Sequence, residues 1–119
     1  MIAVIFEVEP YQGKEAMYFD IAAQLRENLE KMDGFISVER FQSLTRPGVF
    51  LSLSYWRDEE AVKMWRNQDA HRSGQRTGRS EVFLDYRIRI ASVVRDYSKS
   101  DRIEAPHDSN DTLVNGKQP

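Results

Sequence analysis

One segment of the sequence, residues 55–97, constrains the fold more than any other. An apolar run typical of a strand ends at Trp56, and Asp58 follows as a helix N-cap with acidic residues in the first turn after it. The helix predicted over residues 59–68 carries Trp65, and a strand rich in Arg, Ile and Val closes the segment. The segment therefore predicts a strand, a short helix and a strand around an aromatic surface, as a pocket for a small organic molecule requires.

The upstream part of the chain shows two clear periodicities. Apolar residues alternate over residues 2–8, which predicts a strand that Pro10 ends. A long helix is predicted over about residues 14–32, and Gly34 is its stop signal. Apolar residues at spacings of four and three predict that one face of this helix is buried: Tyr18, Ala22, Leu25, Leu29 and Met32.

A hairpin is predicted between the two helices. Its strands cover about residues 35–44 and 49–56, and the Thr-Arg-Pro-Gly sequence at 45–48 is typical of the turn that joins them. With a last strand over residues 86–97, the order of elements is βαββαβ. This order predicts an α+β, ferredoxin-like fold, in which a four-stranded antiparallel sheet carries both helices on one face.

The chain is predicted to form one domain, residues 1–97, followed by a flexible tail, residues 98–119. A length of 119 residues is enough for one modest core, and 40% hydrophobic with 30% charged residues is the composition of an ordinary globular protein. From Ser98 onward Ser, Asp, Asn, Pro and Gly dominate, which favours a tail without a core of its own.

Charge and composition exclude several classes of function. The net charge of −2 gives no field that would attract nucleic acid or an anionic membrane. The chain has no Cys, which removes disulfides, thiolate nucleophiles and Cys-ligated metal sites. Residues 1–7 lack the basic start of a signal peptide, and no apolar run reaches the roughly 20 residues of a membrane span. We therefore expect a cytoplasmic protein that binds neither nucleic acid nor membranes.

Both faces of the predicted sheet carry apolar side chains. The first strand offers Ala3 and Ile5 on one face and Val4 and Phe6 on the other, and residues 49–56 are apolar on both faces as well. Which set faces the helices is left open. Burying one Phe-sized side chain stabilises a protein by about 1.5–3 kcal/mol, so a second apolar face exposed to water is unfavourable. We therefore predict a homodimer that pairs through the sheet face.

Trp65 and His71 are the side chains that chemistry in residues 55–97 would use. Trp65 can be a core residue, or its indole can form one wall of a substrate pocket, and the sequence leaves both alternatives open. His71 is the one side chain of the ordered body that ordinarily titrates near neutral pH, and an exposed surface histidine is the alternative. Trp56 is expected to pack in the core or at a dimer contact, and His107 lies in the tail.

No motif for a metal or a standard cofactor is found in the sequence. The two histidines are too few and too far apart for a recognisable metal site, and Gly74 and Gly78 lack the spacing of a phosphate-binding loop. No Ser lies in a G-x-S-x-G elbow. The Arg residues between 66 and 87 have acidic neighbours and favour a solvated surface of mixed charge. We therefore expect no cofactor.

Three short runs carry a resemblance to a known family. They are residues 55–66 (Tyr-Trp-Arg-Asp-Glu-Glu-Ala-Val-Lys-Met-Trp-Arg), residues 69–72 (Asp-Ala-His-Arg) and residues 75–79 (Gln-Arg-Thr-Gly-Arg). With the βαββαβ order, the chain resembles the antibiotic biosynthesis monooxygenase (ABM) domain family over about residues 1–97. The resemblance implies a dimeric α/β barrel of two ferredoxin-like subunits. Characterised members of the family oxygenate polycyclic phenols, anthrones or quinols without metal or flavin, and one branch degrades haem.

The resemblance extends to individual residues. Trp65 matches the helix Trp that lines the pocket in this family, and His71 matches a His that is common shortly after it. The haem-degrading branch has its haem-ligating His where this chain has Gln75, and an Asn on the first strand where this chain has Phe6. These two differences argue against haem degradation.

The resemblance thus implies a cofactor-independent monooxygenase that oxidises a small aromatic, quinol or polyketide-like substrate with O2. His71 or Arg79 would stabilise the phenolate, and Gln75 or Tyr86 would orient it. Five side chains are expected to form flat walls of the site: Phe6, Leu51, Leu53, Trp65 and Tyr86.

Two other classes of function stay open at this point. The first is a non-catalytic dimeric module that binds a small molecule or serves in a stress response. The second is a haem-binding protein, which the two differences from the haem-degrading branch make the weaker alternative. One scaffold can carry any of these functions.

Overall fold

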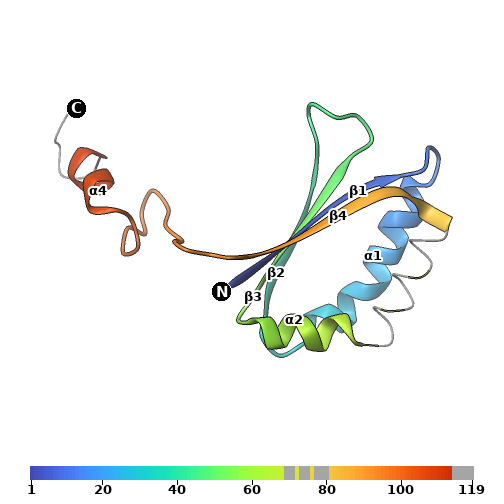
Figure 1. Ribbon diagram of the computed structural model, residues 1–119, viewed down its shortest axis with the longest axis horizontal. Coiled ribbons are helices and arrows are strands. Elements are labelled where there is room, and N and C mark those ends of the chain that lie inside the picture. The colour runs from blue at the N-terminus through green and yellow to red at the C-terminus, as the bar shows by residue number, and fades with distance from the viewer. Residues whose placement is uncertain (69–71, 73–75, 77–80, 114–119) are drawn as a thin grey trace.

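The computed structural model describes residues 1–68, 72, 76 and 81–113. Two helices, α1 (Glu15–Glu30) and α2 (Glu59–Arg66), cover one face of a single antiparallel sheet (Figure 1). The predicted ferredoxin-like βαββαβ fold is confirmed. The sheet has the spatial order β2-β3-β1-β4, and its strands are β1 (Ile2–Pro10), β2 (Phe35–Gln42), β3 (Phe50–Trp56) and β4 (Phe83–Ser92).

The register of the central strand β1 decides which side chains face the helices. Phe6 lies opposite Ser52 on β3 and opposite Ile88 on β4. These side chains line the space beneath the helices, whereas Ala3 and Ile5 point to the opposite face. The alternation within each strand therefore gives the sheet an inner face, toward the helices, and a back face.

Helix α1 buries the face that its spacing predicts. Tyr18, Ala22 and Leu29 are buried, and the partly exposed Leu25 and Met32 pack against the cluster that contains Leu29. The helix begins and ends slightly inside the predicted range. Its N-cap position, Lys14, offers no side-chain hydrogen bond, so packing rather than capping stabilises this end.

The turn after α1 ties that helix to the start of α2. Gly34 has a φ of +84°, a left-handed conformation, and a Cβ added to it would lie 2.6 Å from Cβ of Ala61. The backbone N–H of Arg57 donates to the Gly34 carbonyl oxygen at 2.8 Å. The Arg57 guanidinium also donates to both carboxylate oxygens of Asp33, each at 3.2 Å. The predicted helix stop therefore also sets how closely the two helices approach.

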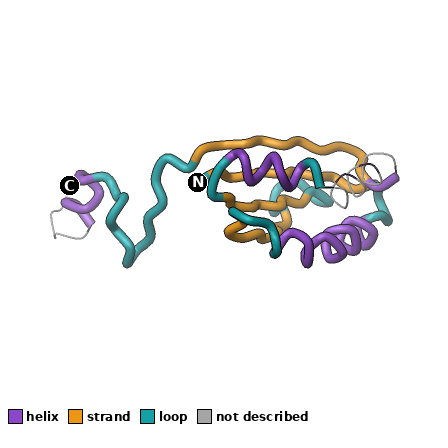
Figure 2. The backbone as a smooth tube through the Cα atoms, turned by 90° about the horizontal axis from the view of Figure 1, so that it is seen from below, coloured by secondary structure: helices purple, strands orange, loops and turns teal. Residues whose placement is uncertain are grey.

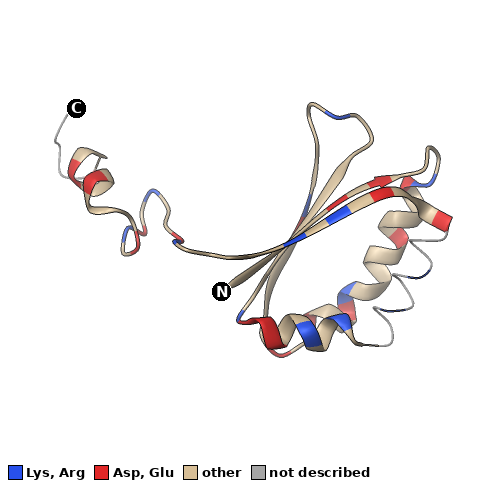
Figure 3. Cartoon of the chain, in the orientation of Figure 1, with Lys and Arg blue, Asp and Glu red and all other residues tan. Residues whose placement is uncertain are grey.

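Asp58 caps α2 as predicted. Its carboxylate accepts a hydrogen bond of 2.9 Å from the backbone N–H of Ala61 and another of 2.9 Å from Nε of Arg57. These hydrogen bonds, the one from Arg57 first, lower the pKa of Asp58. Acidic residues at the start of the helix and basic ones further along it match the helix dipole (Figure 3).

Two clusters of buried residues fill the space between helices and sheet. In the larger one the indoles of Trp56 and Trp65 stack with ring centroids 6.4 Å apart. This cluster contains Ile2, Leu29, Trp56, Ala61, Val62 and Trp65, and the smaller one contains Val8, Tyr18 and Val82.

The chain beyond β4 leaves the body of the domain. Figures 1 and 2 show it as an extended segment that leads to a short helix, α4 (His107–Leu113), well away from the sheet. The radius of gyration is 17.7 Å, whereas a compact chain of this length would have about 13–14 Å. The segment has local order, since the Arg102 guanidinium lies 5.0 Å from the centroid of the Tyr97 ring. That residues 98–119 are flexible stays a prediction.

Candidate functional site

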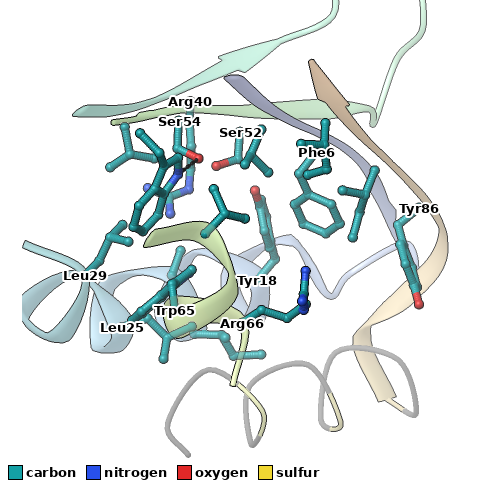
Figure 4. Close-up of a pocket in the computed structure, with 18 of the residues that line it drawn as sticks. Phe6, Tyr18, Leu25, Leu29, Arg40, Ser52, Ser54, Trp65, Arg66 and Tyr86 are labelled. Atoms are coloured by element: carbon teal, nitrogen blue, oxygen red, sulfur yellow. Dashed lines mark hydrogen bonds between the residues drawn. The ribbon is translucent and has the colours of Figure 1, made fainter. Parts of the chain in front are cut away.

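A cavity of about 260 Å³ lies between the inner face of the sheet and the two helices. Side chains from all four strands and from α1 and α2 line it, so the whole domain contributes to one site (Figure 4). The volume is slightly below the range of about 300–1,000 Å³ that is typical of ligand pockets, which suits a molecule of one or two rings.

Trp65 forms part of the cavity wall and belongs to the core as well. Its side chain is 9% exposed, and the Trp56 indole stacks behind it. The indole of Trp56 is fixed in turn, because its Nε1 donates to Oγ of Ser54 at 3.0 Å. Trp65 therefore packs in the core and also lines the cavity, its role toward a substrate stays a prediction, and Trp56 packs in the core.

Aromatic rings gather at the β4 end of the cavity. The ring centroids of Phe6 and Phe83 are 5.8 Å apart, and those of Phe6 and Tyr86 are 5.9 Å apart. The Tyr18 ring meets the Phe83 ring edge-on at 5.8 Å. Such a group of rings offers a planar ligand both faces and edges to pack against.

Two buried polar groups lie in this largely apolar cavity. Tyr18 is 4% exposed, and its hydroxyl has no hydrogen-bond partner among the described residues. The same is true of Nε of Arg40. Burial raises the pKa of Tyr18, and the nearby Arg40 guanidinium opposes this effect in part. The two side chains are thus close enough to interact electrostatically.

The structure brings together three of the predicted site residues. Phe6, Trp65 and Tyr86 all line the cavity. Their roles in binding or catalysis stay predictions. His71, Gln75 and Arg79 lie outside the described residues.

Leu51 and Leu53 do not line the cavity, contrary to the prediction. Both point to the back face of the sheet, where Leu53 lies opposite Ile5. The reason is the alternation of β3, which places Ser52 and Ser54 on the inner face instead. The prediction followed the apolar residues of this strand, but here the polar ones face the site.

Sequence reasoning missed the polar groups of the cavity. Tyr18 was assigned only to the buried stripe of α1, and Arg40 was not singled out. A usable signal exists, because Arg40 is two residues after the apolar Val38 and so shares its face of β2. Ser52 and Ser54, two small polar residues within an apolar strand, also indicate a face that does not pack tightly.

The described residues limit other kinds of site. They contain no group of three or more His, Cys, Asp or Glu side chains that could hold a metal ion. Within the same part of the chain, every helix is too short or too polar to cross a membrane.

Comparison with known proteins identifies the family. The family model described as antibiotic biosynthesis monooxygenase matches residues 1–77. This chain belongs to that family.

Two relatives match the same portion of the chain. The jasmonate monooxygenase ABM of Pyricularia oryzae is 45% identical over 93 residues, which are 78% of this chain and 43% of the relative. The chain thus spans less than half the length of that relative. The uncharacterized protein YqjZ of Bacillus subtilis is 28% identical over 93 residues, which cover 78% of this chain and 79% of that protein.

Solved structures share the fold at low sequence identity. A protein of Mycobacterium tuberculosis has a TM-score of 0.72 with 15% identity, covering 82% of this chain and 98% of that one. A conserved protein of Methanosarcina mazei has a TM-score of 0.69 with 22% identity, covering 76% and 89%. A protein described as an antibiotic biosynthesis monooxygenase has a TM-score of 0.69 with 15% identity, covering 79% and 99%.

Proposed function

We propose that this protein is a monooxygenase that oxidises a small, largely apolar ring compound with O2 in the cavity beneath α1 and α2. The observation that carries the proposal is this aromatic-walled cavity with Trp65 on its wall, in a chain that belongs to the ABM family. Family membership supports oxygenase chemistry. A substrate that fills this largely apolar cavity would displace water from it, as such chemistry requires.

A quinol shows how the reaction balances without an added reductant. Loss of a phenolic proton gives an electron-rich anion, which transfers electrons to O2, and a C–O bond forms at a ring carbon. The O–O bond then breaks, one oxygen stays on the ring, and the other leaves as water. A naphthohydroquinone plus O2 thus gives a hydroxynaphthoquinone plus water, with all four electrons supplied by the substrate. For this reason the proposed reaction uses no metal or flavin.

Individual residues have distinct roles in the proposal. Trp65, Phe6 and Tyr86 hold the flat substrate and exclude water. His71, the proposed base, takes the phenolic proton, while Arg79 and Gln75 stabilise and orient the anion. The Pyricularia oryzae relative is named a jasmonate monooxygenase, which supports a small cyclic substrate of similar size.

Oxygen uptake by the purified full chain on a panel of quinols and anthrones tests the proposal. Uptake should continue after treatment with a metal chelator, and one atom of labelled O2 should enter the product. Trp65→Phe should slow uptake, and His71→Ala should nearly abolish it. Met64→Ala is the matched control, because Met64 lies on the exposed side of the same helix and is 60% exposed. Formation of hydrogen peroxide without incorporation of label would refute the proposal.

A binding module without turnover is the second candidate function. It is favoured by the composition of the cavity, since the described lining residues include no His, Asp or Glu that could act as a base. Tight binding of a quinol without oxygen uptake, and unchanged by His71→Ala, would establish this alternative.

The site is proposed to work in a homodimer that forms in the cytoplasm, through the back face of the sheet. That face presents a concave surface with Ala3, Leu53 and Tyr55. The segment after β4 continues it, and carries exposed apolar residues such as Val94 and Ile103, 79% and 93% exposed. A tail that extends from its own domain would lie along a second copy. This arrangement would bury both surfaces.

Sedimentation of the full chain tests the dimer. The wild-type protein should sediment as a dimer, and Leu53→Glu should convert it to a monomer, because a carboxylate on the back face would have to be buried without a partner. Deletion of residues 98–119 should weaken the dimer. A wild-type monomer at micromolar concentration would refute this proposal.

A further inference from the structure

We propose that Tyr18 and Arg40 form an anchor for the carboxylate of a ring-containing acid in the cavity, with Arg40 on β2 and Tyr18 on α1. This inference rests on the proposed function, because it specifies the substrate class of the same site. It makes the substrate an apolar ring system that carries an acid group.

The first argument is the state of Tyr18. Its side chain is 4% exposed and lines the cavity, and its hydroxyl has no partner among the described residues. Figure 4 shows this hydroxyl directed away from α1 into the cavity. Buried hydroxyl groups normally have hydrogen-bond partners, so an unpartnered one inside a cavity points to a ligand acceptor. Burial raises the pKa of Tyr18, which keeps the phenol protonated and able to donate at neutral pH.

The second argument is the isolation of Arg40. The ion pairs among the described residues are exposed and involve other arginines, such as Arg57 with Asp33 and Asp58. Arg40 is half-buried, and it is absent from these ion pairs. A guanidinium is a permanent cation whose planar fork matches a carboxylate. No carboxylate of the described residues pairs with Arg40, which fits an anionic ligand as its partner.

The third argument is the charge of the cavity lining. The described lining residues include Arg40 and Arg66, and none of them is Asp or Glu. The nearest acidic side chain on β1, Glu7, points to the back face and is paired with Arg46 and Arg89 at 3.3 and 3.1 Å. Among the described residues, the charge of the cavity lining is therefore positive and lies in an apolar surrounding, where an anion gains most.

The fourth argument is a polarity gradient across the sheet. One row of the inner face runs from Arg40 on β2 through Ser52 on β3 and Phe6 on β1 to Ile88 on β4. Neighbouring strands are about 4.8 Å apart, so the row changes from charged to apolar over about 14 Å. A ring acid lying along it would place its carboxylate at Arg40 and Tyr18 and its ring against Phe6. The carboxylate would thereby fix the orientation of the ring against Phe6.

Anaerobic calorimetry with three matched probes tests the anchor: dihydroxynaphthoic acid, its methyl ester, and naphthohydroquinone. Oxygen is removed so that binding is measured without turnover. We expect the acid to bind most tightly, and Arg40→Met to weaken it by about tenfold to a hundredfold, the range of charge-assisted hydrogen bonds. The same substitution should change the dissociation constants of the ester and of the carboxylate-free quinol by less than about twofold. Tyr18→Phe should weaken the acid alone, by about tenfold.

Matched variants separate anchoring from folding. Arg46→Met removes an exposed arginine of the β2–β3 hairpin that does not line the cavity, and it should leave all three affinities unchanged. Arg40→Lys keeps the charge but loses the planar fork, and it should retain part of the preference for the acid. Thermal unfolding of each variant shows whether it is folded, and Tyr18→Phe keeps the proposal testable if Arg40→Met does not fold.

The outcomes distinguish the anchor from the proposed function. Equal weakening of acid and ester by Arg40→Met, or no effect on either, would overturn the anchor. Oxygen uptake with the quinol but no preference for the acid would also overturn it, and would leave the monooxygenase proposal in place. Binding of the acid that depends on Arg40, without oxygen uptake on any compound, would support the anchor and refute the monooxygenase.

Discussion

Gly34→Ala should destabilise the domain more than its position in a surface turn suggests. A left-handed backbone at an L residue costs about 1–2 kcal/mol, and Gly34 has a φ of +84°. The added Cβ would also lie 2.6 Å from Cβ of Ala61, a contact that forces α2 or the turn to shift. Overpacking of this kind costs about 1–3 kcal/mol. The sum is about 2–5 kcal/mol, a large fraction of the stability of a typical domain.

Gly48→Ala is the matched control for this prediction. Gly48 has a similar φ of +80°, but nothing lies within 4 Å of an added Cβ, so only the backbone term of about 1–2 kcal/mol applies. Urea unfolding of both variants, at one fixed protein concentration, measures the difference directly. We expect Gly34→Ala to be less stable than Gly48→Ala by about 1–3 kcal/mol. Equal losses of unfolding free energy in the two variants would show that the close approach of α2 to this turn adds no cost to the Gly34 substitution.

Four further changes test other parts of the structure. Asp58→Asn should keep the helix cap but weaken the pH dependence of stability. The pKa of Asp58 is lowered in the folded state, so its stabilising effect is present above about pH 4 and is lost as pH falls further. Acid unfolding of both proteins measures this difference. Trp65→Ala should lower the free energy of unfolding by about 3–5 kcal/mol, against less than about 0.5 kcal/mol for the exposed Met64→Ala. Leu53→Glu should abolish the dimer in sedimentation while calorimetry still detects the ligand site. Tyr18→Phe should leave the ligand-free protein as stable as the wild type or more stable, because it removes a buried hydroxyl without a partner, and thermal unfolding checks this.

The sequence was sufficient for the order of elements and for the buried face of α1. Strict alternation in β1 and the four-three spacing of α1 each indicate one element type, and Asp58 and Gly34 end their elements for reasons that are local to the backbone. Which side chains of β1 face the helices was not predictable in the same way. Ala3 with Ile5 and Val4 with Phe6 are equally apolar, and only packing of the helices decides between them.

The site was predicted in part, for a related reason. Trp65, Phe6 and Tyr86 do line the cavity, although for Phe6 the sequence left open which face of β1 meets the helices. Leu51 and Leu53 were misplaced because hydrophobicity was taken as the mark of the inner face. In β3 the back face is the more apolar one, and Ser52 and Ser54 leave room for the cavity beneath the helices.

The two faces of β3 therefore separate assembly from binding. A side chain at position 51 or 53 reaches only the back face, and one at position 52 or 54 reaches only the cavity. Substitutions one residue apart can thus change the proposed dimer without touching the ligand, or the ligand site without touching the dimer. Ser52→Leu would extend the apolar surface of Phe6 toward Arg40 and shorten the polar end of the row, whereas Leu53→Glu leaves that row intact. If loss of the dimer nevertheless removed oxidation in a protein that still binds its ligand, the second copy would have to contribute a side chain that the inner face of one protomer lacks.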